Sequence, residues 1–124
     1  MIETTDLAKA TLFYDAILQP LDIIRVVNNL DTVDYALQAA PDAIEFYVTR
    51  PFDQQPLHHG NGVIIAFAAL CLALVDQLHK IGMWNGDEDP GKARPWLSGG
   101  SIYYAYLRDP DGNKICGFND SSTA

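Results

Sequence analysis

The chain has 124 residues, of which 16 are acidic and 8 are basic, so its formal net charge is −8. Apolar residues make up 48% of it and charged residues 19%, which is typical of one folded domain rather than a disordered chain. An acidic surface repels phosphate groups, so a nucleic-acid partner is not expected. No apolar stretch reaches the roughly 18–20 residues of a membrane span, and the N-terminus lacks a secretory-signal pattern. We therefore expect a cytoplasmic protein with no membrane partner.

The first half of the chain predicts one helix followed by three strands. Thr5 and Asp6 are suited to cap a helix, apolar residues recur at three- and four-residue intervals from Leu7 to Leu18, and Pro20 ends the pattern. The helix is expected over about 6–18, with no more than a stub of a strand before it. Strands follow over 22–27, 32–37 and 43–48, where β-branched or alternating segments are separated by Asn, Asp and Pro.

The second half predicts a similar order of elements after a connecting loop. Two prolines and no periodicity mark 50–61 as that loop, and 63–68 is expected to form a buried strand. An apolar stripe that includes a core Cys71 predicts a helix ending at Gly82, and a long loop with one short strand near Met83 follows to 101. Strands over 102–108 and 114–118 are joined by Asp-Pro-Asp-Gly-Asn, a strong hairpin signal.

This repeated order predicts a single α+β domain built from two similar modules. The first module is placed at about 1–49, the linker at 50–61, the second module at about 62–120 and a disordered tail at 121–124. Three strands in succession do not fit the alternation of a parallel α/β fold. Identity between the halves is weak, so the duplication rests on the order of elements.

Three segments stand out for their motifs: Asp6–Leu18, Gly62–Phe67, and Tyr104–Ile115 with its hairpin turn. Together with the order of elements, they resemble the vicinal-oxygen-chelate superfamily, which includes glyoxalases, bleomycin-resistance proteins and extradiol dioxygenases. The resemblance implies two paired βαβββ modules that form a curled mixed sheet around a cleft. It also implies a homodimer.

The resemblance further implies where a metal would be held. Metal-using members take His or Gln, and then Glu, from the first and last strands of each module. Here Ile64 occupies the fifth-strand His position and Cys116 the last-strand Glu position, while Glu45 alone falls where the first module's closing carboxylate is expected; before the first helix only Glu3 is a counterpart. Because divalent ions need about four to six donors, we predict no metal and no other cofactor.

The terminal hairpin supplies the first candidate site. If its turn spans 109–113, Tyr106 lies opposite Cys116, and Tyr104, Tyr106 and Cys116 share one face. The resemblance places that face in the cleft and matches Tyr106 to a substrate-contacting tyrosine of the fosfomycin-resistance branch, so its hydroxyl is expected to donate to a bound oxygen. The alternative is a packed aromatic residue whose hydroxyl has a backbone partner. Cys116 is expected as a buried, inert thiol rather than a nucleophile.

Glu45 is the second candidate, because a carboxylate within an apolar strand is suited to general-base work if it faces the cleft. On the outer face it would simply be solvated. Tyr47, Ile64 and Trp96 complete the predicted substrate-binding set. Four aromatic residues could form a pocket for a planar ligand or could only fill the core, and the loop over 85–101 is a candidate lid: Trp84, Trp96, Tyr103 and Phe118. The three histidines are not expected to bind a metal: His58, His59 and His79.

Three functions remain open from the sequence. The preferred one is a metal-free protein that binds a small organic molecule in the cleft, either sequestering it or performing acid–base chemistry with Glu45 and Tyr106. The second is a metal-dependent lyase, isomerase or dioxygenase of the same superfamily. The third is a non-catalytic accessory protein whose acidic surface meets a partner.

Overall fold

The computed structural model describes residues 1–29, 31–51, 53, 55–56, 62–85, 94–95 and 101–121. The first half contains β1 (Ile2–Glu3), α1 (Leu7–Leu18), the short 3-10 helix η1 (Gln19–Leu21), β2 (Ile23–Asn28), β3 (Thr32–Leu37) and β4 (Ile44–Thr49). The second half contains β5 (Ile65–Ala68), α2 (Leu72–Asn85), β6 (Arg94–Pro95), β7 (Ile102–Arg108) and β8 (Lys114–Asp120). Among these elements, no helix is long and apolar enough to cross a membrane.

Local chemistry explains where α1 begins and ends. The Asp6 carboxylate accepts a hydrogen bond from the Lys9 backbone N–H at 3.0 Å, which satisfies one of the unpaired donors of the first turn. Pro20 lies in η1, and Asp22 then takes a left-handed backbone with φ of 57°, which Asp tolerates better than most residues. The chain can therefore turn sharply into β2.

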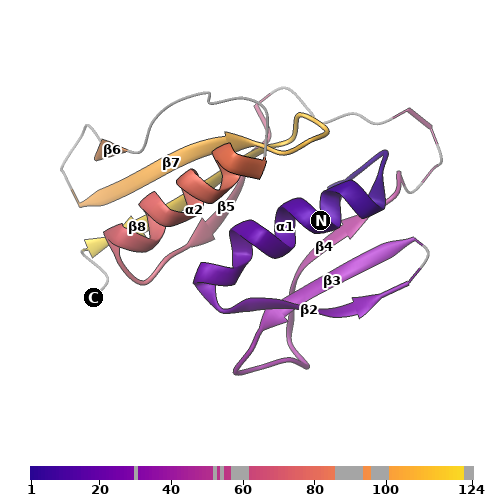
Figure 1. The fold of residues 1–124 in the computed structure, drawn as a ribbon, viewed down its shortest axis with the longest axis horizontal. Helices are drawn as coiled ribbons and strands as arrows, with labels where there is room; N and C mark the ends of the chain where they lie inside the picture. Colours follow the sequence, from indigo (N-terminus) through magenta and orange to yellow (C-terminus); the bar gives the residue numbers. More distant parts are fainter. Residues whose placement is uncertain are drawn as a thin grey trace.

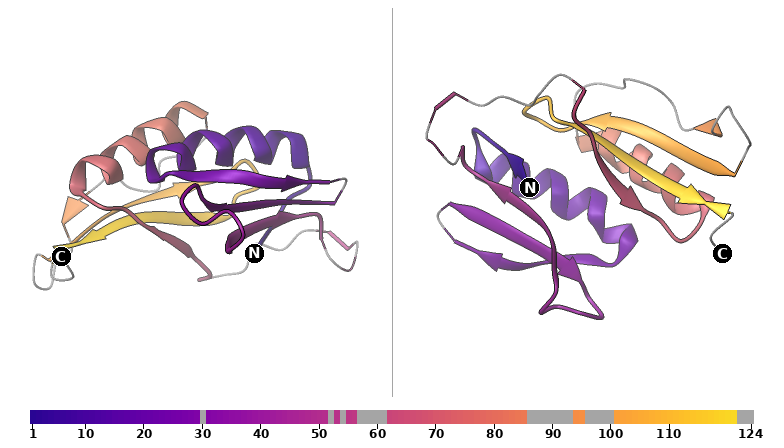
Figure 2. Two further views of the ribbon diagram at one scale, coloured as in Figure 1. Left: turned by 90° about the horizontal axis from the view of Figure 1, so that it is seen from below. Right: turned by 180° about the vertical axis from the view of Figure 1, so that it is seen from behind.

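The strands form two four-stranded mixed sheets, and the expected α+β fold of two βαβββ units is confirmed. Sheet A has the order β1-β4-β3-β2 and sheet B the order β5-β8-β7-β6, with β1–β4 and β5–β8 as the parallel pairs. Both helices lie on one side of the two sheets (Figure 1), and the left view of Figure 2 shows the helices above the strands. The opposite face of both sheets carries no helix among the described elements.

Aromatic side chains join the two halves in one hydrophobic core beneath the helices. Tyr14 from α1 packs against Phe46 of β4 with ring centroids 5.1 Å apart, and Phe46 packs edge-on against Phe67 of β5 at 5.1 Å. Tyr14, Phe46 and Phe67 are all buried. The core therefore runs from one sheet to the other without a break.

The turn between β7 and β8 is hydrogen-bonded to the first half of the chain. The Asp109 carboxylate accepts from the Tyr14 hydroxyl at 2.6 Å, and from the Asn113 side-chain and backbone N–H groups at 2.9 and 2.8 Å. The Asn113 amide also donates to the Glu3 carbonyl at 2.9 Å. Burial raises the pKa of Asp109, although the hydrogen bonds from Tyr14 and Asn113 oppose that shift.

The Asp111 carboxylate of the same turn accepts hydrogen bonds from two threonines near the start of the chain. Thr4 donates its hydroxyl to Asp111, and Thr5 donates both its hydroxyl and its backbone N–H to the same carboxylate. We call these contacts the turn clasp; it comprises Thr4, Thr5, Tyr14, Asp109, Asp111 and Asn113. The clasp fixes the last hairpin against the start of the chain.

Three expectations about the second helix are wrong. The helix continues past Gly82 to Asn85, so Met83 and Trp84 are helical rather than part of a strand. Gly82 lies inside the helix because its missing Cβ makes room for Leu107 of β7. Cys71 precedes the first helical residue and is exposed, so it is not a core residue.

Candidate functional site

The β7–β8 hairpin brings three predicted site residues to one face. The predicted register is confirmed: Tyr106 pairs with Cys116, and Tyr104 pairs with Phe118. Gly117, between Cys116 and Phe118, faces α2: a Cβ added to Gly117 would lie 3.1 Å from the Leu78 side chain of that helix. Since alternate residues point to opposite faces, Tyr104, Tyr106 and Cys116 lie on the face away from the helices. The rings of Tyr104 and Tyr106 meet edge-on with centroids 4.9 Å apart.

Cys116, paired with Tyr106, is a buried residue of the same face. Burial raises the pKa of its thiol to about 11, against the smaller opposing effects of an Ala105 backbone hydrogen bond and the Lys114 charge. The thiol donates to the Gly117 carbonyl at 3.4 Å. At neutral pH the sulfur is therefore a protonated thiol, and it offers contact surface rather than a nucleophile.

Two cations flank the tyrosines at the turn end of the hairpin. Arg108 pairs with Lys114 in the strand register, and the Lys114 Nζ lies 4.7 Å from the centroid of the Tyr106 ring. Arg108 donates to the Gly112 carbonyl at 2.8 Å, which holds its guanidinium along the turn. Lys114 was not among the site residues expected from the sequence, although its position opposite Arg108 followed from the predicted register.

Sheet A places Glu45 and Tyr47 on its own helix-free face. Both are exposed, whereas Phe46 and Val48 between and after them are buried toward α1. Glu45 falls at an irregularity in the pairing of β3 with β4, so it has no paired residue on β3. Glu45 is thus a solvated carboxylate on the face where a general base was expected.

Matching hydrogen bonds show which positions of the two halves correspond. The Thr4 N–H donates to the Thr49 carbonyl, and the Ala69 N–H donates to the Phe118 carbonyl in the same way. Counting back two residues from each acceptor places Tyr47, rather than Glu45, at the position of Cys116. Glu45 then corresponds to Lys114.

Asp34 is a further residue that the sequence did not single out. It pairs with Tyr47 across β3 and β4, and its Oδ1 is a buried oxygen without a hydrogen-bond partner in the described part of the chain. Such an oxygen favours a hydrogen-bond donor beside it. No sequence signal marks Asp34, because its importance depends on which strand lies beside β3.

Ile64 and the described aromatic residues of the predicted pocket come from different parts of the molecule. Ile64 is 38% exposed and lies two residues before Ala66, which pairs with Cys116. Tyr103 points toward the helices and donates its hydroxyl to Asp76 of α2, so it cannot share a pocket with Phe118 on the other face of the sheet. Trp84 is 84% exposed at the end of α2. Tyr103 and Phe118 therefore do not line one pocket as expected, and Trp84 is not enclosed by the described part of the chain.

Several predictions fall outside the described residues. They concern Trp96, the pair His58 and His59, most of the candidate lid over 85–101, and residues 122–124 of the tail.

The described residues do not fit a divalent metal. No three side chains from His, Cys, Asp and Glu lie close enough together among them to hold an ion. Within the described chain, the hairpin face offers phenols, one thiol and a lysine, so it lacks the three or four thiolate, imidazole or carboxylate donors that hold a divalent cation. The chemistry of this face is that of hydrogen bonding and apolar contact.

Comparisons with known proteins point to one family. A glyoxalase/bleomycin resistance protein from Albidiferax ferrireducens T118 is 38% identical, with a TM-score of 0.84 over 96% of this chain and 94% of that one. A glyoxalase-related enzyme from Fulvimarina pelagi is 15% identical, with a TM-score of 0.73 over 96% of this chain and 84% of that one. A lactoylglutathione lyase from Agrobacterium tumefaciens is 22% identical, with a TM-score of 0.63 over 96% and 92%.

The last two structures share the fold of this chain, whereas the first is similar in sequence as well. No protein-family model matches the chain, and no curated protein matches it either. Because the similarity at 38% identity spans nearly all of both chains, this chain belongs to the glyoxalase/bleomycin resistance protein family, as the resemblance to the vicinal-oxygen-chelate superfamily implied.

Proposed function

We propose that this protein binds a small organic molecule on the helix-free face of its sheets, with the β7–β8 hairpin as the main contact. The observation that carries the proposal is the grouping of Tyr104, Tyr106 and Cys116 on one face, with the Lys114 ammonium over the Tyr106 ring. Aromatic edges and a buried thiol suit an apolar or planar body. A nearby lysine and a tyrosine hydroxyl suit a ligand oxygen at one end.

The proposed binding does not depend on a divalent metal. Ligand recognition instead uses the Tyr106 hydroxyl as a hydrogen-bond donor and the Lys114 charge beside it. Tyr47 and Ile64 are both exposed and are proposed as further contacts, together with Trp96. If the protein is an enzyme, Glu45 is the proposed base and Tyr106 the proposed acid.

We also propose that two copies of the chain associate through the helix-free faces. The support is that both sheets leave this face without a helix among the described elements, and that Tyr47 on β4 and Ile64 just before β5 are 39% and 38% exposed. A second copy would shield these side chains and enclose the ligand. A cytoplasmic location is part of the same proposal, and the two free cysteines suit a reducing compartment.

A thermal-shift screen tests the binding proposal. The probes are aromatic aldehydes, ketones and carboxylic acids, each measured with EDTA and again with added Zn²⁺ or Mn²⁺. We expect hits that raise the melting temperature equally with and without EDTA, because a ligand that binds only the folded state stabilises it by mass action. Light scattering on the same samples should give twice the chain mass of 13.7 kDa.

Two tyrosine variants locate the site. Tyr106→Phe should weaken the best hit about tenfold, as expected for the loss of one hydrogen bond to a charged or strongly polar group. Tyr103→Phe is the matched control, because that hydroxyl bonds to Asp76 on the helix side. Hits that require added metal would support a metal-dependent lyase, isomerase or dioxygenase. No hit at all would favour an accessory role.

A further inference from the structure

A groove on the other side of the molecule, between α1 and the edge of sheet A, is not used by the proposed function. It has a volume of about 490 Å³. Four residues of the first two turns of α1 line it: Leu7, Ala8, Thr11 and Leu12. Its opposite wall comes from the end of β2, the following turn and Arg50 after β4. The volume is within the range of about 300–1,000 Å³ that is usual for small-molecule sites.

An irregularity in β2 builds the polar wall of this groove. Arg25 pairs with Tyr35 and Asn28 pairs with Val33, while the register shifts between Arg25 and Val27. Tyr35 and Val33 are fully buried under α1, so Arg25 and Asn28 both lie on the α1 side. In a regular strand, residues three apart would point to opposite faces. The extra residue therefore brings a guanidinium and an amide into the same groove.

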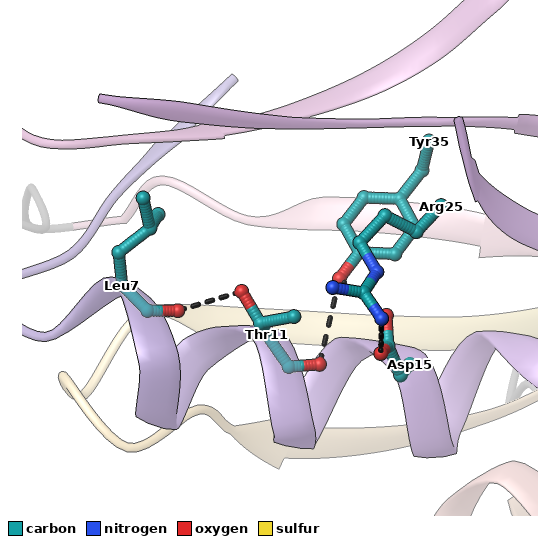
Figure 3. A network of polar contacts seen from close by, with 5 residues as sticks. All are labelled: Leu7, Thr11, Asp15, Arg25 and Tyr35. Atoms are coloured by element: carbon teal, nitrogen blue, oxygen red, sulfur yellow. Dashed lines mark hydrogen bonds and ion pairs between the residues drawn. The ribbon is translucent and has the colours of Figure 1, made fainter. Parts of the chain in front are cut away.

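Neighbouring side chains hold Arg25 in place (Figure 3). Its Nη2 lies 3.2 Å from Oδ2 of Asp15 on α1, and the Tyr35 hydroxyl donates to Oδ1 of the same carboxylate at 2.9 Å. Within the described part of the chain, Arg25 makes this ion pair through Nη2. A guanidinium has five N–H donors, so this contact leaves donors for a ligand.

The charged side chains among the described lining residues of the groove are both basic, and one of them, Arg25, is also paired with Asp15 of α1. The chain has 8 basic residues against 16 acidic ones, and two of the basic residues line this groove. None of its described lining residues is acidic. On the other wall, the Leu12 side chain is 72% exposed and offers apolar surface to an occupant.

We propose that this groove is a second binding site, for a small organic anion with an apolar chain. The carboxylate or similar anionic head lies between Arg25 and Arg50, and the chain lies along Leu7 and Leu12 of α1. Cationic donors at one end and apolar side chains along one wall select such an amphipathic anion over an inorganic ion or a neutral molecule. The site is independent of the ligand on the helix-free face.

Isothermal titration of the full chain with octanoate tests this proposal. We expect saturable binding of one octanoate in the groove, at least about tenfold weaker binding of octan-1-ol, and no measurable heat with acetate. Arg25→Gln and Arg50→Gln should each weaken octanoate about tenfold, since each removes one charged hydrogen-bonding partner. Leu12→Ser should also weaken octanoate, because it removes apolar surface from the wall that contacts the chain of the ligand.

Two controls test whether the anion binds in this groove. Lys80→Gln removes the same charge from α2, outside the lining of the groove, and should leave the octanoate affinity unchanged. Amide chemical shifts should move at Leu7–Leu12 and Arg25–Asn29. If they move instead at Tyr104–Cys116, or if Tyr106→Phe weakens octanoate as much as Arg25→Gln does, the anion binds on the helix-free face and the proposal fails.

The groove could also be covered by a second copy of the chain. In that case Leu12→Ser would lower the mass measured by light scattering, and octanoate would not bind the wild-type protein. That combination would overturn the proposal. Failure of the thermal-shift screen with aromatic probes would not affect it, because the two experiments address opposite sides of the molecule.

Discussion

The two cysteines present very different thiols to solvent. Cys71 is exposed just before α2, whereas Cys116 is buried on the hairpin face and its pKa is raised to about 11. A thiol must be accessible and deprotonated to react. We expect one rapid equivalent of reaction when the native protein at pH 8 is treated with Ellman's reagent.

Serine variants assign that reaction. Cys71→Ser should remove the rapid phase, while Cys116→Ser should leave it intact. In guanidinium chloride, wild-type protein should release two equivalents. A rapid phase that survives in Cys71→Ser would show that Cys116 is accessible. The conclusion that the Cys116 thiol is unreactive would then be wrong.

At the scale of single residues, the sequence predicted those features that have a local cause. The Asp-Pro-Asp-Gly-Asn turn fixes the hairpin register, and the register alone places Tyr106 opposite Cys116. The prediction failed for Cys71, because an apolar stripe does not show at which residue the helix begins. Asp34 could not be found either, since its buried oxygen depends on pairing with β4.

Gly82 controls how closely α2 approaches sheet B. A Cβ added at this position would overlap Cδ1 of Leu107 and lie 2.9 Å from its Cδ2, and the Leu107 side chain is 1% exposed. Alanine usually stabilises a helix interior relative to glycine by about 1 kcal/mol. Here we expect Gly82→Ala to lower the free energy of unfolding by about 1–2 kcal/mol, because a fully buried Leu107 must shift.

Urea unfolding of a double-mutant cycle checks this expectation. Leu107→Ala alone should be destabilising because it leaves a cavity. In Gly82→Ala/Leu107→Ala the new methyl group has room, so the loss should be smaller than the sum of the single losses. Additive losses would mean that the two side chains do not compete for the same space.

The elements themselves were predictable because hydrophobic periodicity and turn residues are local signals. Both long helices and the strands of the two halves occur close to their expected ranges. The end of α2 was not predictable in this way, since glycine is usually a stop signal. The role of Gly82 is set by Leu107, which is distant in sequence and adjacent only after folding.

The turn clasp connects the two halves of the molecule and makes their stability depend on pH. A folded carboxyl with a raised pKa binds its proton more tightly than the unfolded chain does. The contribution of Asp109 is therefore fully present below its ordinary pKa of 3.8 and is lost as the pH rises through the higher folded value. In Asp109→Asn the side chain at this position does not titrate, so this contribution to the pH dependence of stability is absent.

We expect Asp109→Asn to be less stable than wild type at pH 7 by about 1–3 kcal/mol, because an amide has one accepting oxygen. It cannot accept both from Tyr14, which donates to Oδ2, and from the Asn113 backbone N–H, which donates to Oδ1. The difference between the two proteins should grow when the pH is lowered from 7 to 4. Guanidinium unfolding at both pH values measures it, and comparison with the variant cancels the titration of other carboxyl groups. A difference that shrinks toward pH 4 would contradict the raised pKa of Asp109.

At the scale of the whole molecule, the order of elements predicted two βαβββ units, and the similarity at 38% identity agrees with the family that the motifs suggested. The contacts that hold the two units together could not be predicted from the order of elements. Tyr14 gives no sign in the sequence that it bonds to Asp109, and no periodicity shows that α1 and α2 occupy the same side of both sheets.

The clasp also has a consequence for synthesis on the ribosome. Thr4 and Asp111 are bonded to each other although 107 positions separate them along the chain. While the β7–β8 hairpin is still inside the exit tunnel, the Thr4 hydroxyl can donate to the Asp6 carbonyl but has no Asp111 carboxylate to bind. The contact between Thr4 and Asp111 can therefore form only after the segment that carries Asp111 has left the ribosome, which is late compared with the local contacts of α1.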